Sequence, residues 1–190
     1  MDTVYDNDHR GKRFTIYSPC LLTACSQRTR RIVCAKGEHA MPGLYLQEFS
    51  PGQVFQHQLR RTITESDNML FSNMTLNPQP LHIDFDFASR TEWGKPLVNS
   101  LFTLGLMIGI SVNDTTIGTT IANLGMTDVI FPHPMFHGDT FHVETEVISV
   151  RDSKSRNDRG IVEFEHRGFN QDNVLVARCR RQAMMRKKVE

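Results

Sequence analysis

The segment at residues 77–84 combines two prolines with a single histidine, in the order Asn-Pro-Gln-Pro-Leu-His-Ile-Asp. The prolines and the polar residues beside them favour a turn, and this turn would present His82. An unperturbed imidazole has a pKa of ~6.5, so it can accept or donate a proton near neutral pH. A turn histidine can also serve only as a hydrogen-bonded structural residue. We therefore treat His82 as a candidate for acid–base chemistry.

A long apolar segment follows this turn, at residues 97–112. Pro96 suits the first turn of a helix, where a missing N–H costs nothing. Three- and four-residue spacing predicts one buried helix face, formed by Leu97, Leu101, Leu104 and Ile108. The segment is shorter than the ~20 residues that cross a bilayer, so we expect a helix buried in protein and no membrane partner. This helix would begin beside the turn that carries His82.

Two shorter helices are predicted from capping signals. Thr64 and Asp67 have the spacing of a helix-start pair, because the hydroxyl can accept a free N–H while the carboxylate favours the positive end of the helix. The buried side of that helix is expected to contain Met69, Leu70, Phe71 and Met74. Asp84 is expected to cap a second short helix that extends to Arg90.

Strands are predicted before and after these helices. The first occupies residues 53–62, and the others occupy residues 121–131, 140–151, 160–169 and 174–185. Between residues 140 and 151, Phe141, Val143 and Val147 alternate with polar side chains, which indicates a half-buried antiparallel strand. One long helix with several antiparallel strands predicts an α+β architecture in which the sheet wraps the helix.

The composition is that of one ordinary domain. The chain has 190 residues, of which 39% are hydrophobic, and a formal net charge of +1, so a real core is expected and a nucleic-acid partner is not. Its four cysteines lack metal-ligand spacing, which argues against a metal site and against a disulfide framework. We therefore expect a reducing compartment and a cytoplasmic protein.

Residues 1–40 differ from the rest, because arginines cluster there among Ser and Thr without apolar periodicity. We expect them to be an N-terminal extension, and residues 41–190 to form the domain. Either Met41 is the true start or the extension is a transit peptide, although its acidic residues count against the second interpretation.

These motifs resemble the MaoC-like hydratases of the hotdog fold, which include the (R)-specific enoyl-CoA hydratases. The resemblance covers about residues 49–186. It rests on three segments: Thr64-Glu65-Ser66-Asp67, the turn with His82, and Phe136-His137-Gly138-Asp139-Thr140. It implies a single hotdog domain in which an antiparallel sheet is wrapped around a long central helix.

The resemblance also implies reversible hydration of an enoyl-CoA thioester, with the active site shared by two subunits of a homodimer or a larger homo-oligomer. CoA would be part of the substrate, and no cofactor is expected. Hydration needs proton transfer, the role expected of His82, and hydrogen-bond donors for the thioester oxygen. Free backbone N–H groups near Asn99 and Ser100, at the start of the central helix, would supply such donors to the bound substrate.

Two residues depart from the family pattern. The family has an aspartate five residues before the histidine, where this chain has Asn77. An asparagine cannot act as a base, although it can hold a water molecule or the thioester, so we expect His82 to carry the main proton transfers, with a substrate carboxylate or Glu65 assisting. The His-Gly pair that the family has at the helix start is replaced by Asn99-Ser100, which leaves the backbone role of Ser100 intact.

The segments at residues 90–94 and 96–100 look similar to the branch of the family that acts on mesaconyl-CoA or itaconyl-CoA, thioesters of branched C5 dicarboxylic acids. A second carboxylate on the substrate needs a cationic partner, for which Arg90 is the candidate. The alternative for Arg90 is a solvated side chain on a short helix. His133 and His137, which flank Pro134, are interpreted as loop residues.

Two other functions fit the same features. A hotdog acyl-CoA thioesterase would share the fold and could use the amide of Asn77 to position water. A catalytically silent subunit would bind acyl-CoA without turnover if the loss of the aspartate abolished the chemistry.

Overall fold

The computed structural model describes residues 5–7, 13–15 and 43–188. The chain divides into two units, Met1–Glu38 and His39–Glu190. In the first unit, β1 (Tyr5–Asn7) and β2 (Arg13–Thr15) pair as antiparallel strands, which the sequence did not predict. The expected domain boundary at residue 40 lies outside the described residues, and so does the choice between a later start and a transit peptide.

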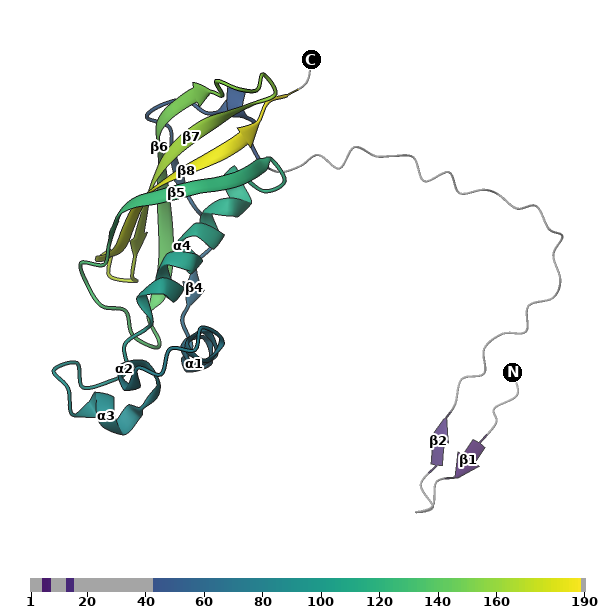
Figure 1. Cartoon of the computed structure of the whole chain (residues 1–190). Coiled ribbons are helices and arrows are strands. Elements are labelled where there is room, and N and C mark those ends of the chain that lie inside the picture. The colour runs from purple at the N-terminus through teal and green to yellow at the C-terminus, as the bar shows by residue number, and fades with distance from the viewer. Residues whose placement is uncertain (1–4, 8–12, 16–42, 189–190) are drawn as a thin grey trace. The chain divides into compact units, whose positions relative to one another are not determined.

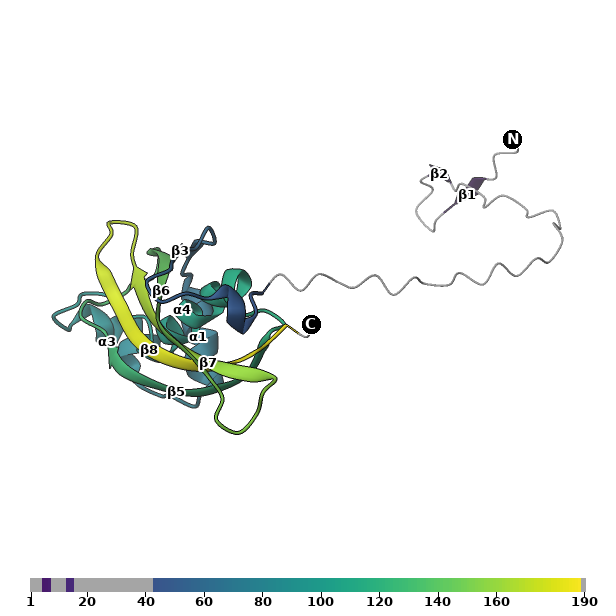
Figure 2. The same cartoon turned by 90° about the horizontal axis from the view of Figure 1, so that it is seen from above.

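The second unit is built on a six-stranded antiparallel sheet, which Figures 1 and 2 show from two sides. Its strands are β3 (Val54–Gln56), β4 (Arg61–Thr62), β5 (Thr120–Ile130), β6 (Thr140–Asp152), β7 (Arg159–Phe169) and β8 (Leu175–Arg186). The order is β3-β6-β7-β8-β5, and β4 also pairs with β6. The four later strands confirm the predictions, whereas the expected strand at 53–62 is divided into β3 and β4.

The long helix α4 (Ser100–Thr115) lies across one face of this curved sheet (Figure 1). It contacts β6, β7 and β8, and apolar side chains from the helix and the strands form one core between them, including Met107, Ile110, Phe141, Val143 and Ala177. The predicted α+β architecture, with a sheet wrapped around a central helix, is therefore confirmed. None of the helices in the described part of the chain has the length and apolar character of a membrane-spanning segment.

The start and the buried face of α4 differ from the prediction. The helix begins at Ser100, because the Asn99 side chain caps it by accepting the Leu101 N–H at 3.0 Å. Leu97 is not helical, and forms an isolated antiparallel bridge with Phe136. The buried face contains Thr103, Met107, Ile110, Ser111 and Thr115, whereas Leu101 is 59% exposed.

Four short helices complete the unit: η1 (Leu46–Glu48), α1 (Glu65–Met74), α2 (Pro80–Ile83) and α3 (Phe85–Ser89). Two capping predictions are confirmed. Thr64 accepts the Asp67 N–H while the Asp67 carboxylate accepts the Thr64 N–H, and Asp84 accepts the Phe87 N–H at the start of α3.

The predicted buried side of α1 is wrong. Leu70 and Met74 are exposed, and the buried residues of this helix are Asn68 and Ser72. Two polar side chains therefore point into the protein at the place where α1 approaches the turn that carries His82. A buried amide without hydrogen-bond partners costs free energy, so the Asn68 side chain is expected to form hydrogen bonds inside the protein.

We predict that Gly168→Ala destabilises the fold. Gly168 lies on β7 between Val143 and Ala177, and an added Cβ would lie 2.3 Å from Cζ of Phe141, whose ring is fully buried. Overpacking of this kind costs about 1–3 kcal/mol in the free energy of unfolding, measured by denaturant titration.

The matched control is Gly105→Ala on α4, where no atom lies within 4 Å of the added Cβ. Replacement of a helix-interior glycine by alanine should stabilise the protein by about 0.5–1 kcal/mol. Equal effects of the two substitutions would contradict this description of the core.

Candidate active site

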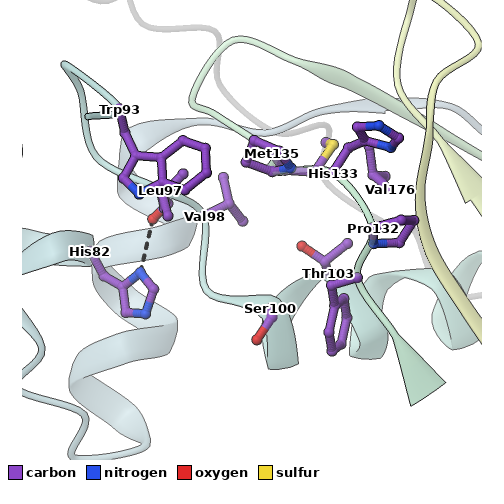
Figure 3. Close-up of a pocket in the computed structure, with 12 residues that line it drawn as sticks. His82, Trp93, Leu97, Val98, Ser100, Thr103, Pro132, His133, Met135 and Val176 are labelled. Atoms are coloured by element: carbon purple, nitrogen blue, oxygen red, sulfur yellow. Dashed lines mark hydrogen bonds between the residues drawn. The ribbon is translucent and has the colours of Figure 1, made fainter. Parts of the chain in front are cut away.

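One cavity of about 280 Å³ lies between the start of α4 and the loop that joins β5 to β6 (Figure 3). Its walls come from six parts of the chain: His82 of α2, Trp93, Leu97 and Val98, Ser100 and Thr103 of α4, residues 131–135, and Val176 of β8. Most of these side chains are apolar, and the polar ones are few. This combination is typical of a pocket for an organic ligand with one reactive group.

His82 lies on α2, which starts at Pro80. Its ring Nδ1 is 3.0 Å from the carbonyl oxygen of Leu97 (Figure 3, dashed line). A carbonyl oxygen can only accept, so Nδ1 carries the proton and donates it in this hydrogen bond. In the neutral ring, Nε2 then has a free lone pair. In this tautomer, Nε2 of His82 can act as a base.

The start of α4 lies beside the same cavity. Ser100 lines the cavity and is the first residue of the helix. Among the described residues, the N–H groups of Ser100 and Phe102 have no hydrogen-bond partner, whereas that of Leu101 is taken by the Asn99 side chain. Free N–H groups at the positive end of a sixteen-residue helix favour an anionic oxygen. His82 and Ser100 thus line one cavity, whereas Asn99 caps α4 and is not among the lining residues.

The other two candidate residues lie elsewhere. The side-chain oxygen of Asn77 accepts the Gln79 N–H at 3.1 Å, which shapes the turn before α2. Arg90 pairs with Asp86 and has 64% of its side chain exposed. Neither residue is among those that line the cavity.

His133 is a cavity residue that the sequence did not identify. It follows β5 as expected of a loop residue, but its ring lines the cavity on the side opposite His82 (Figure 3). Its Nδ1 is 2.9 Å from the carbonyl oxygen of Leu175, so this ring also carries its proton on Nδ1 and leaves Nε2 free. The sequence signal was its place between two prolines, directly after a strand.

Comparison with known proteins agrees with this fold. Residues 47–167 match the model of the MaoC-like domain family, and the chain belongs to that family. It is 30% identical over 147 residues to the beta-methylmalyl-CoA dehydratase of Chloroflexus aurantiacus, covering 77% of this chain and 41% of the relative. It is 27% identical over 146 residues to the mesaconyl-CoA hydratase of Cereibacter sphaeroides, covering 77% and 42%.

A Mycobacterium tuberculosis protein with a double hotdog fold superimposes with a TM-score of 0.70 at 24% identity, over 78% of this chain and 46% of that one. The fold of the second unit is therefore a single hotdog, as expected. The chain spans less than half the length of each of the two curated relatives named above.

We predict that Asn99→Ala destabilises the protein by about 1 kcal/mol, because the first turn of α4 loses its cap. Asn99→Ser is the matched control, since a serine hydroxyl can accept the same N–H. The free energy of unfolding of both variants should be compared with wild type. An equal loss in both would show that the cap is not what Asn99 contributes.

Proposed function

We propose that this chain is a hydro-lyase that catalyses the reversible hydration of an enoyl-CoA thioester. The observation that carries the proposal is the pairing, in one cavity, of a base with a fixed tautomer and free donors at a helix N-terminus. These are the two requirements of the reaction, proton transfer and stabilisation of an enolate oxygen. The family and the printed activities of the relatives support it.

In this mechanism the thioester oxygen of the acyl-CoA lies against the free N–H groups at the start of α4. Nε2 of His82 takes a proton from water while the water oxygen bonds to C3. The electrons of the C2–C3 double bond move onto the thioester oxygen as an enolate, where the helix N-terminus stabilises them. Collapse of the enolate and delivery of a proton to C2 complete the addition.

The proton for C2 needs a donor, and Asn77 cannot be one. His133 is the other ionisable side chain that lines the cavity, and its free Nε2 can hold the proton. After one hydration His82 is protonated and His133 is neutral, and exchange with solvent restores both rings. Asn77 contributes to the turn that carries His82 through its bond to Gln79.

A branched C5 dicarboxylic thioester, such as mesaconyl-CoA or itaconyl-CoA, is the proposed substrate. The beta-methylmalyl-CoA dehydratase and mesaconyl-CoA hydratase relatives favour it. Arg90 precedes the cavity residue Trp93 by three positions. Its surface pair with Asp86 contributes little to stability, so the guanidinium could exchange Asp86 for a substrate carboxylate at small cost.

A homodimer is the proposed assembly. β5 is the last strand in the sheet order, and Leu124, Val129 and Ile130 on this edge strand are exposed. Pairing of this edge with a second copy would satisfy its free backbone groups and cover those side chains. Residues 131–135 continue from β5 into the cavity wall, so such a dimer would place the second copy close to the site. The expected cytoplasmic location stays a prediction.

The test is turnover of mesaconyl-CoA, itaconyl-CoA and crotonyl-CoA, followed by loss of enoyl-thioester absorbance with a thiol assay in parallel. We predict thiol-free turnover of a C5 dicarboxyl substrate, and a fall of about 10²–10⁴-fold in His82→Ala. Release of thiol would instead identify a thioesterase. Binding without turnover by the wild-type protein would identify a silent binding subunit.

A separate prediction concerns His133. The Asn side chain in His133→Asn can still donate to the Leu175 carbonyl, but it has no proton to give to C2. We expect kcat to fall about 10²-fold or more and the alkaline limb of the pH–rate profile to disappear.

The matched control for this substitution is His142→Asn, because His142 lies on β6 and is not a cavity residue. An unchanged pH–rate profile in His133→Asn would exclude His133 from the proton transfers.

A further inference from the structure

The side-chain amide of Asn68 is fully buried and connects three segments of the site. Its oxygen accepts the Asn99 N–H at 2.8 Å. Its nitrogen lies 3.1 Å from the carbonyl oxygen of His82 and 3.0 Å from that of Leu97. One amide on α1 therefore bonds to the turn of the candidate base, to the carbonyl that fixes the tautomer of that base, and to the cap of α4.

The hydrogen bonds define the orientation of this amide. Because the Asn99 backbone can only donate, the amide oxygen must face it, and the nitrogen must face the two carbonyl groups. The nitrogen also lies 3.0 Å from Nε2 of His137. Its two hydrogens thus face three acceptors, and the imidazole of His137 is one of them only while its Nε2 is unprotonated.

We propose that Asn68 is a positioning residue of the active site, which holds the His82–Leu97 pair against the start of α4, and that protonation of His137 disrupts this arrangement. The inference rests on the proposed hydratase function. It extends that function to a residue that does not line the cavity.

The positioning role of Asn68 follows from an acceptor that it shares with His82. Leu97 offers one carbonyl oxygen to both the His82 ring and the Asn68 amide. Loss of the amide would remove one of the bonds that hold this carbonyl, and the ring of His82 would lose part of its support. The same loss would release the Asn99 N–H, two residues before the Leu101 N–H that the Asn99 side chain caps. The base and the oxyanion donors would therefore lose their mutual geometry together.

The surroundings of His137 favour its neutral form. The ring is half-buried, it stacks at a tilt against Phe85 of α3, and Glu65 of α1 is the charged group that acts on it. Burial lowers the pKa of His137, and the Glu65 carboxylate opposes this only partly. The unfolded chain therefore binds this proton at a higher pH than the folded chain. The stabilising network is complete above a pH of ~6.5 and is lost as the pH falls through the lower folded pKa.

The experiment is Asn68→Asp in the full chain, with Asn73→Asp as the matched control. Asn73 is exposed on the same helix, so the control makes the same chemical change away from the site. In Asn68→Asp the carboxylate can still accept the Asn99 N–H, but it cannot donate to Leu97 or His82. We expect a folded protein, shown by circular dichroism, in which kcat falls about 10²-fold while KM changes little.

NMR titration of His137 tests the contact between residue 68 and this ring, and a fall of kcat at unchanged KM separates a positioning role from a purely structural one. A carboxylate beside Nε2 raises the pKa of His137, and we expect this rise in Asn68→Asp and not in Asn73→Asp. This readout does not depend on turnover, so it separates failure of the inference from failure of the proposed function. A folded Asn68→Asp with wild-type kcat, or with an unchanged His137 titration, would overturn the proposal.

A second variant covers the case in which Asn68→Asp does not fold. Protonation of either His82 or His137 should stop turnover. In a plot of log kcat against pH, the acid limb of the wild type should therefore approach a slope of about 2, one for each proton. The side-chain oxygen of glutamine can accept from Asn68 without titrating. His137→Gln should therefore leave an acid limb with a slope of about 1. The same steep limb in this variant would also overturn the proposal.

Discussion

The hydrogen bond from the His82 ring to the Leu97 carbonyl is the interaction on which the rest of the site depends. It decides which ring nitrogen carries the proton, and it ties the turn of α2 to the segment that leads into α4. Leu97 is fixed from other directions as well, since its N–H donates to the Leu81 carbonyl and the neighbouring Val98 N–H donates to that of Met135. The ring of His82 is therefore oriented by a backbone carbonyl group. Such a group can only accept a hydrogen bond, so Nδ1 must be the protonated nitrogen.

The hotdog sheet supplies the rigidity behind this arrangement. α4 packs its buried face on β6, β7 and β8, so the position of its first turn is set by the core. The short helices α1 to α3 have few buried apolar residues. α1 is joined to the start of α4 by polar contacts of Asn68 and Ser72 with Asn99, and by packing of the Phe71 ring against Phe102. Buried polar groups are stabilising only when each finds a partner, which explains why Asn68 and Ser72 occupy the buried side of α1. The site is thus assembled on a rigid helix by a small number of directional bonds.

The strands and caps could be predicted because their signals are local. In β6 and β7 one face is buried, so apolar and polar residues alternate, and Thr64 and Asp84 cap the helices that begin beside them. The buried face of α4 could not be predicted, because apolar side chains occur on all sides of this helix and hydropathy does not choose between them. Asn68 and His133 were missed for a different reason, since their partners at Leu97 and Leu175 are distant in sequence. Asn77 and Arg90 are in the right segment, but their side chains engage Gln79 and Asp86 outside the cavity.

The most direct test of this account is the tautomer of His82, observed in the ¹⁵N NMR spectrum of its ring and assigned by comparison with His82→Gln. The account predicts that in the neutral ring Nδ1 has the chemical shift of a protonated nitrogen and Nε2 that of an unprotonated one. Such a spectrum would show that the Leu97 carbonyl prepares the ring as a base before any substrate binds. The opposite tautomer, or two nitrogens averaged by exchange, would contradict the central claim.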